Sequence, residues 1–322
     1  MYQCTNDTKK ILQGFSPHYQ STLIFPSFNL TDDDIYSVNT QHASVSGENL
    51  IPGAIISETL TAEVELANNK ISNKEFEWRL TVEDTEEEIT MGHFIVDSCT
   101  KVNNHYQIQA SDKLSKSDKI YVPKIKLPAW SDDITADICS QLGVIYVKPD
   151  SQYFDDEDKN LVKTVYSQRV KVTGFNYWIE TIPDKTTMRQ MLSYIAGMQG
   201  AFGIINRQGD FEYKRYSIID EDIFTDKTDE LEINESTVDT TELISTFDSP
   251  YLTEILREQI RQCWVKEYVP HTINMRLGDP RIDVWDVFNI DNKSIPVMQL
   301  ERKYDGGFTT IIKATVSTKE EY

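Results

Sequence analysis

Apolar and polar residues alternate along two segments in the first third of the chain, 55–66 and 76–83. Alternation with a period of two is typical of strands that bury one face. The segments 91–100 and 106–110 have a strand-like composition as well. The apolar positions of the two alternating segments are Ile56, Leu60, Ala62, Val64 and Leu66, and Phe76, Trp78, Leu80 and Val82. We therefore predict an antiparallel β-meander here, curled into a barrel or a sandwich.

The middle of the chain changes to the period of a helix. Ser131 or Asp132 can cap a short helix, which Gly143 would end. The apolar stripe of this helix is Ile134, Ile138 and Leu142. The spacing of these residues predicts a helix with one buried side.

A second helix is predicted from Thr187 to Gly200, because Thr187 and Gln190 form the sequence pattern of a capping box. The segments 202–205 and 211–216 then predict a short hairpin around a turn that contains Gly209. Two helices and a hairpin together indicate a compact α+β unit.

The last third begins with an acidic, strand-like stretch. Ser249 followed by Pro250 predicts the start of another helix. Its apolar side would be Leu252, Ile255, Leu256 and Cys263. A turn at 278–280 leads into a second meander over 287–317, with a turn at 305–307.

The order of these segments is β, mixed, β. We predict an α+β protein that is mainly β, with a first β-domain over 1–120 and an α+β domain over 121–216. A second β-domain with one helix would occupy 217–322.

The formal charge of the chain is −20, from 32 basic and 52 acidic residues. This balance argues against binding nucleic acid or anionic membrane through bulk electrostatic attraction. The segment 51–100 holds 3 basic and 11 acidic groups, and the segment 201–250 holds 4 and 13. The segment 101–200 holds 13 and 12. The acidic blocks are either two solvated loops or two domains that present acid to a common space.

The sequence contains no recognisable catalytic, cofactor or metal motif. The four cysteines, Cys4, Cys99, Cys139 and Cys263, are scattered, and we expect buried reduced thiols. The five histidines are isolated, and we expect surface positions for them. Carboxylates are numerous enough to leave a glycosidase pair open. The five tryptophans are dispersed, which favours packing over a sugar-binding platform.

No apolar stretch is long enough to span a bilayer, and no secretory signal is visible at Met1. We expect a soluble protein that is made in the cytoplasm.

Several segments, taken in their order, resemble phage tail baseplate hub proteins, a family also found in tailocins and prophage contractile tails. The segments are 28–35, 51–54, 91–97, 137–144, 187–196, 200–202, 207–211 and 278–287. The motif positions that we expect to be structural are Gly92, Arg189, Tyr194, Gly200, Gly209, Gly278, Asp279 and Pro280. The sequence departs from the family pattern at Trp285, where relatives usually carry glycine.

The resemblance implies a structural homotrimer with no enzymatic activity and no cofactor. Each subunit would contribute two tube-like antiparallel β-domains, separated by a small α+β domain, to a ring of six. The ring would join the hexameric tail tube to the trimeric central spike. Further neighbours would be tape-measure, LysM-type and baseplate wedge proteins. The protein would reside in the bacterial cytoplasm during assembly and then in the baseplate of the particle.

We further hypothesise that the acidic blocks line the lumen of this ring. The candidate residues are Glu83, Asp84, Glu86, Glu87, Glu88, Asp229, Glu230 and Glu232. Across a lumen wider than the Debye length of ~8 Å, repulsion is largely screened, and an acidic wall would not retain a polyanion. The alternatives from other classes are a tail-associated peptidoglycan hydrolase and a carbohydrate-binding tail-tip module.

Overall fold

The computed structural model describes residues 1–14, 17–45, 52–66, 71–149, 151–154, 174–215, 217–218, 228–233, 238–239, 249–251, 257, 267–268, 271–275, 277–290 and 293–314. The helices are α1 (Asn6–Leu12), η1 (Asp32–Asp34), η2 (Lys113–Lys116), α2 (Ser131–Leu142) and α4 (Met188–Met198). The first strands are β1 (Tyr19–Phe25), β2 (Phe28–Leu30), β3 (Ile35–Ala43), β4 (Thr59–Val64), β5 (Glu75–Val82), β6 (Glu87–Val102) and β7 (His105–Ser111).

The middle strands are β8 (Ala129–Trp130), β9 (Ser151–Phe154), β10 (Gly174–Ile179), β11 (Phe202–Ile205), β12 (Phe211–Lys214) and β13 (Ser217–Ile218). The last strands are β14 (Thr228–Ile233), β15 (Val238–Asp239), β16 (Glu267–Tyr268), β17 (His271–Met275), β18 (Asp286–Ile290), β19 (Lys293–Pro296), β20 (Gln299–Tyr304) and β21 (Phe308–Ala314). Apart from Arg257, which is helical, the helix predicted after Pro250 lies outside the described residues, as does Cys263.

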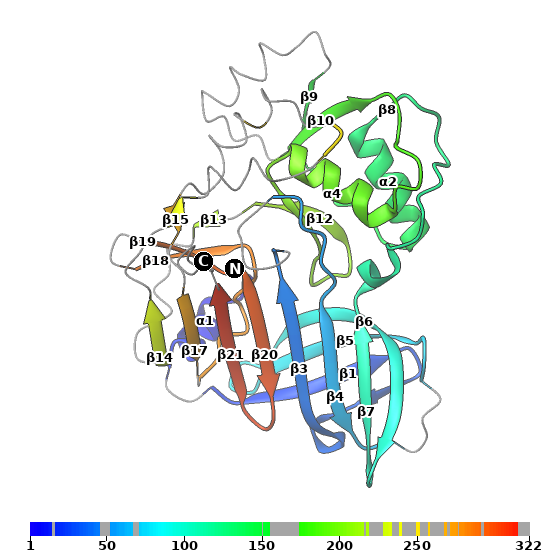
Figure 1. Ribbon diagram of the computed structural model, residues 1–322. Coiled ribbons are helices and arrows are strands. Elements are labelled where there is room, and N and C mark those ends of the chain that lie inside the picture. Colours follow the sequence, from blue (N-terminus) through cyan, green and yellow to red (C-terminus); the bar gives the residue numbers. More distant parts are fainter. Residues whose placement is uncertain are drawn as a thin grey trace, which may run out of the picture.

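One large antiparallel sheet dominates the molecule (Figure 1). Its strand order is β14-β17-β21-β20-β3-β4-β7-β6-β5-β1-β2. β20 pairs with β3 from Tyr304 opposite Val38 to Gln299 opposite Ala43. The β-rich portions at the two ends of the chain therefore stand side by side in a single sheet, where the sequence predicted two β-domains.

The sheet curls without closing, since β14 and β2 remain its edges among the described residues. This corrects the expectation of a closed barrel. β1 and β5 cross behind β3 and β4 (Figure 1), and the space between them is filled by apolar side chains. The core includes Leu23 of β1, Val38 of β3, Leu60 of β4, Trp78 of β5 and Ile108 of β7. Each such burial contributes about 1.5–3 kcal/mol.

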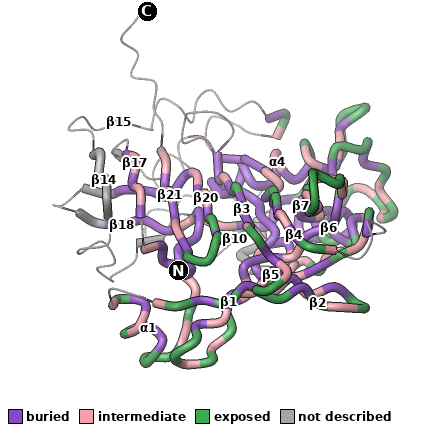
Figure 2. Tube along the Cα trace, turned by 90° about the horizontal axis from the view of Figure 1, so that it is seen from below, coloured by how far each residue is buried: buried purple, intermediate pink, exposed green. Residues whose placement is uncertain are grey.

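Figure 2 shows the buried positions following β3, β20 and β21, with many exposed positions at α1. The alternation predicted for β4 and β5 is confirmed, because their apolar positions all face the core. The strand predicted from residue 55 begins only at Thr59, and Ile55 instead forms a bridge with Gly203.

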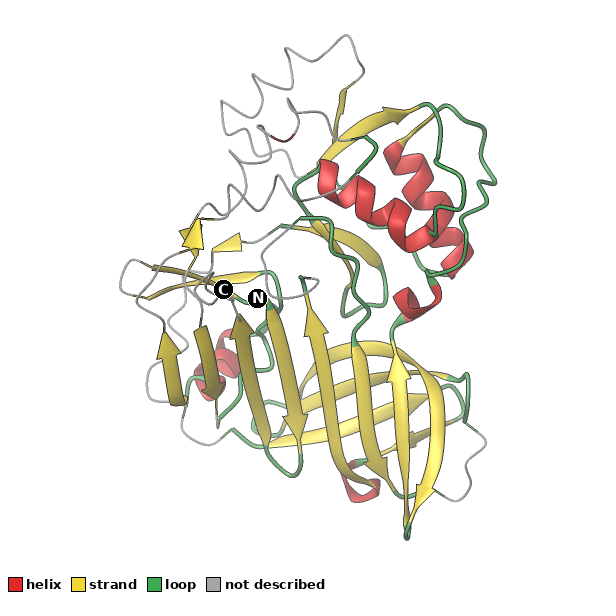
Figure 3. Ribbon diagram, viewed as in Figure 1, coloured by secondary structure: helices red, strands yellow, loops and turns green. Residues whose placement is uncertain are grey.

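The two longest of the described helices, α2 and α4, lie together at one end of the molecule, above the sheet (Figure 3). α4 begins with the predicted capping box, in which Thr187 Oγ1 accepts from Gln190 N. α2 ends at Gly143, whose φ of +70° is the left-handed conformation that glycine adopts readily. Its N-cap is Trp130, so neither predicted residue caps it. Ser131 instead donates from Oγ to Asn176 Oδ1 over 3.0 Å.

The hairpin β11–β12 connects this α+β unit to the sheet. Ile205 and Phe211 face the core around α2 and α4. Phe202 and Ile204 face a third core, which also contains Leu300 of β20. One short hairpin thus packs into two cores, and its turn points at the sheet.

Among the helices that the structure describes, none combines the length and the apolar character needed to cross a membrane. Three of the cysteines are described, and all three are free thiols. Cys139 is buried as predicted, whereas Cys4 and Cys99 are only half-buried.

Candidate functional site at the junction of three segments

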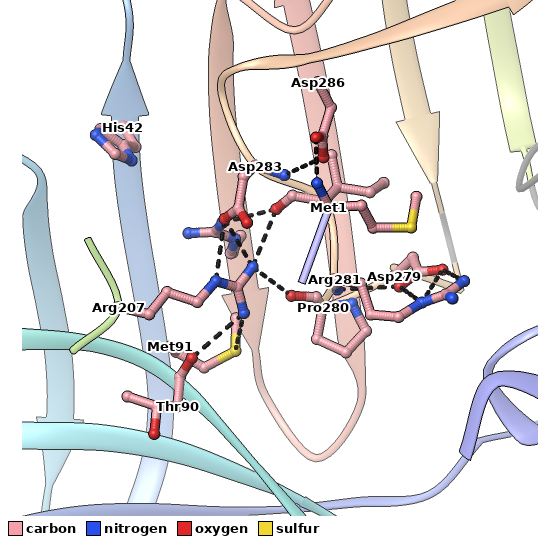
Figure 4. A network of polar contacts seen from close by, with 12 residues as sticks. Met1, His42, Thr90, Met91, Arg207, Asp279, Pro280, Arg281, Asp283 and Asp286 are labelled. Carbon is pink, nitrogen blue, oxygen red and sulfur yellow. Dashed lines mark hydrogen bonds and ion pairs between the residues drawn. The ribbon is translucent and has the colours of Figure 1, made fainter. Parts of the chain in front are cut away.

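A buried network of charged side chains lies where the hairpin turn, the segment 279–286 and β20 meet (Figure 4). Arg207 stands in the turn of the hairpin, 6% exposed. Its Nε and Nη2 donate to Asp283 Oδ1 over 3.0 and 2.7 Å. Nη2 also donates to the carbonyl of Pro280 over 2.7 Å. The hairpin is therefore bound to the segment 279–286 by one guanidinium.

The segment 279–286 is folded around its own aspartates. Asp279 receives the backbone N–H of Arg281 over 3.0 Å and its Nη2 over 2.8 Å, and both side chains are almost fully buried. Asp286 Oδ2 receives the backbone N–H of Asp283 over 2.9 Å. The amino group of Met1 is bound to Asp286 Oδ1. These bonds fix the position of the Asp283 carboxylate.

Arg302 enters the network from β20. Its Nη2 donates to Asp283 Oδ1 over 2.9 Å, and its Nη1 donates to Glu58 Oε1 over 3.2 Å. The other oxygen of Glu58 lies 3.7 Å from His42 Nδ1 on β3. Arg302 thus joins the segment 279–286 to the segment before β4.

Burial controls the ionisation of these groups. It lowers the pKa of His42, and the neighbouring Glu58 only partly opposes this. It also lowers the pKa of Arg302. Burial, reinforced by Asp283, raises the pKa of Asp286 to about 6. His42 Nε2 and Arg302 Nε have no hydrogen-bond partner among the described residues. The network therefore holds many charged side chains that are almost fully buried from solvent.

A second set of contacts attaches α4 to the segment 55–58, which precedes β4. Arg189 donates to the carbonyls of Ile55 and Leu114 and pairs with Asp118. The Asp112 carboxylate accepts a hydrogen bond from the backbone N–H of Glu58 over 2.9 Å. Burial raises the pKa of Asp112 to about 7. The segment 55–58 is consequently held from the α+β unit on one side and from β20 on the other.

The buried network fixes the relative positions of the hairpin, the segment 279–286 and β20. Each carboxylate of the network is engaged by an arginine or a backbone N–H, and a buried ion pair specifies geometry more than it adds stability. No group of three or more metal-ligating side chains occurs among the described residues.

Four of the predicted structural residues belong to the junction or touch it. The carboxylate of Asp279 accepts from Arg281, and the carbonyl of Pro280 accepts from Arg207. Gly278 leaves no room for a side chain, because a Cβ would lie 2.6 Å from Thr310 Oγ1. Gly209 has a φ of +84° in the hairpin turn and packs against His93.

The roles of the remaining glycines and of Tyr194 are local. A Cβ on Gly92 would lie 2.9 Å from the Phe94 ring. Gly200 has a φ of +60° after α4. The ring of Tyr194 lies edge-on to that of Tyr251, 5.9 Å away. Trp285, where the sequence departs from the family pattern, lies beneath Lys214, 5.0 Å from its Nζ.

Sequence reasoning missed Arg302, Glu58 and Asp283 as a unit, and it expected His42 at the surface, whereas His42 is buried. One signal was available. Arg302 shares the inward parity of Leu300 and Tyr304 on β20. A charge at an inward position indicates a buried partner.

The candidate lumen acids are placed in two separate parts of the sheet. Glu87 binds Thr5, the N-cap residue of α1, and Thr8 within that helix, and Glu88 pairs with Arg79 on β5. Glu83, Asp84 and Glu86 are exposed in the turn between β5 and β6. The strand β14 forms an edge of the sheet, with six strands between it and β6. The side chains of Asp229, Glu230 and Glu232 on that strand lie outside the described residues. The lumen remains a prediction.

Two of the tryptophans that are distant in sequence come together in space. Trp130 and Trp178 face each other across the β8–β10 pair, with ring centroids 5.0 Å apart. Trp178 is 45% exposed. These two residues are dispersed in the sequence but not in space, and the preference for packing over a sugar-binding platform stays a prediction.

The fold is shared with tail proteins of known structure. One is the tail protein from Neisseria meningitidis MC58, with a TM-score of 0.55 and 10% identity over 92% of this chain and 96% of that one. Another is the prophage MuSo2 43 kDa tail protein from Shewanella oneidensis, with a TM-score of 0.53 and 9% identity over 94% of this chain and 100% of that one. No family model and no curated protein matches the sequence. At these identities the likeness is one of fold.

Proposed function

We propose that this chain is a structural component of a phage tail or a related contractile particle. The observation that carries the proposal is the shared fold, which extends over nearly the whole of this chain and nearly the whole of both tail proteins. A likeness that extends over nearly the whole chain favours a common architectural role over one acquired by a single domain.

Within that role, we propose a homotrimeric hub between the hexameric tail tube and the trimeric spike. The pairing of β3 with β20 supports this, because it places both β-rich portions of one chain side by side in one wall. Three such walls could form a pseudo-sixfold ring. The buried junction supports it as well, since a ring that transmits load needs its parts held in a fixed orientation.

We propose that the protein acts by assembly and not by catalysis. The charged groups of the junction bind one another and backbone groups, so they support a structural use. Assembly would proceed by burial of apolar surface between subunits and by pairing of open strand edges.

The test is the mass of the purified chain in solution, with the tube and spike proteins added afterwards. We expect a trimer that binds one spike trimer and the end of the tube. A stable monodisperse monomer at micromolar concentration would argue against the hub. Clearing of bacterial cell wall in a zymogram by the purified chain would argue for the hydrolase alternative instead.

A further inference from the structure

A strip of unpaired lysines lies along the surface of the α+β unit. Lys116, Lys119, Lys124 and Lys126 are all exposed, and none has a carboxylate within 4.0 Å among the described residues. The one acidic residue between them, Asp118, is paired with Arg189. In a chain of net charge −20, an unneutralised basic strip of this kind is the exception. We refer to residues 116–126 as the basic strip.

Apolar side chains stand between these lysines. Ile120 is 59% exposed and Val122 is 67% exposed. Tyr121, between them, is buried and donates to Asp137 Oδ2 over 2.8 Å. Ile120 forms a β-bridge with Thr187, and at this point of the strip the side chain of Tyr121 is buried while those of its two neighbours are exposed.

The backbone of the basic strip is fixed. Tyr121 N donates to the Thr186 carbonyl over 2.9 Å, and the Lys119 carbonyl accepts from Met188 N over 2.9 Å. Gln141 of α2 donates to the Val122 carbonyl over 3.1 Å. The exposed isoleucine and valine are thus presented by a rigid segment, as in an interaction surface.

The complementary charge occurs in the turn between β5 and β6. Glu83, Asp84 and Glu86 are exposed there, and we refer to them as the acidic turn. The turn is fixed by Glu83 N, which donates to the His18 carbonyl over 3.1 Å. It is also fixed by Glu87, which binds α1.

The basic strip and the acidic turn lie on opposite sides of one subunit. The strip is bonded to α2 and the turn to α1, and Figure 1 shows these two helices at opposite sides of the molecule. They are therefore too far apart to meet within one chain. Two different patches on opposite sides make a head-to-tail contact, and such contacts produce rings when the rotation closes.

We propose that the basic strip of one copy of this chain binds the acidic turn of the next copy. Ile120 and Val122 would form the apolar centre of the contact, with the lysines and carboxylates around it. This contact defines a head-to-tail association, and that the ring holds three copies rests on the proposed function. For Glu83, Asp84 and Glu86, this contact replaces the predicted position in the lumen.

The experiment measures self-association of the full chain by sedimentation, for the wild type and for K119E/K124E. Like charges facing each other at an interface are strongly unfavourable, so we expect the dissociation constant to rise by roughly 100-fold. The control is K101E/K303E, which makes the same change of net charge on two other exposed lysines and should leave association nearly unchanged. Circular dichroism should show all variants folded.

The decisive variant combines K119E/K124E with D84K/E86K, which restores the wild-type net charge and reverses both patches. We expect this variant to associate again, with the affinity weakened by salt as in the wild type. If the wild type forms an oligomer that K119E/K124E leaves intact, or if the combined variant stays dissociated, the contact is wrong while the hub proposal stands. If the wild type is a monomer, both are wrong.

Discussion

The core of the curled sheet and the junction of the three segments are both buried, but different forces hold them. The sheet core is made of aliphatic and aromatic side chains such as Leu23, Leu60 and Trp78. The junction is made of Arg207, Asp283 and their charged partners. Apolar attraction is non-directional and follows the area buried. Ion pairs in a dry site require particular distances and angles, so the junction specifies how the parts of the chain are oriented.

The largest expected effect is in the junction. Arg302→Met leaves the Glu58 carboxylate without a cation and removes one of the two arginines that bind Asp283. We expect the free energy of unfolding, measured by denaturant titration, to fall by about 3–5 kcal/mol. Arg302→Met combined with Glu58→Met should lose less than the single change, because the stranded carboxylate is gone.

The matched change in the sheet core is Leu23→Ala, with an expected loss of about 2–5 kcal/mol. No second truncation should relieve that loss. If the combined junction variant were less stable than Arg302→Met alone, the distinction between the two regions would be wrong.

A smaller effect is expected where a strand packs against the junction. Gly278→Ala introduces a Cβ 2.6 Å from Thr310 Oγ1 and 2.7 Å from the backbone of Thr309, so the structure must shift. We expect a loss of about 1–3 kcal/mol. Gly307→Ala is the control, because a Cβ there meets nothing within 4 Å and its melting temperature should stay near that of the wild type. Equal losses at both positions would show that packing around Gly278 is loose.

The smallest effect concerns pH. Burial holds the pKa of His42 below its ordinary value, so the folded protein keeps this imidazole neutral where the unfolded chain binds a proton. The contribution of His42 to stability should therefore fall as the pH decreases below about 6.5, whereas Asp112 and Asp286, whose pKa values burial raises, contribute in the opposite direction. The charged groups facing His42 are Glu58, Arg302, Asp283 and Arg207.

His42→Gln removes this proton uptake. The stability difference between wild type and variant should change by up to about 1.4 kcal/mol per pH unit below that point. Unfolding titrations at a series of pH values measure it, and Leu23→Ala, in the apolar core, should show a pH dependence parallel to that of the wild type. A constant difference between wild type and His42→Gln would contradict the assignment.

Local features were predictable from the sequence because their causes lie within a few residues. The capping box of Thr187 and Gln190, the left-handed end of α2 at Gly143 and the alternation of β5 all depend on neighbours in the chain. The motif glycines were expected to be structural because of the resemblance to a family and not because of local causes. In the structure, the constraints on Gly92 and Gly278 come from side chains packed against them.

The junction was not predictable from the sequence. The two ends of its central ion pair, Arg207 and Asp283, are 76 residues apart, and Arg302 and Glu58 are 244 apart. Nothing local distinguishes these charges from solvated ones. Only the inward parity of Arg302 on β20 indicated that it is buried.

The amino-acid sequence alone determined the kinds of element, their order and the acidic character of the chain, because periodicity, caps and charge are properties of short segments. Only the tertiary structure decided that β3 pairs with β20, so that both ends of the chain share one sheet. It also decided which charges are buried together and which surface lysines have no carboxylate partner within the described part of the chain. Such pairings depend on closing loops of hundreds of residues, and their outcome is a balance of burial and desolvation over the whole molecule.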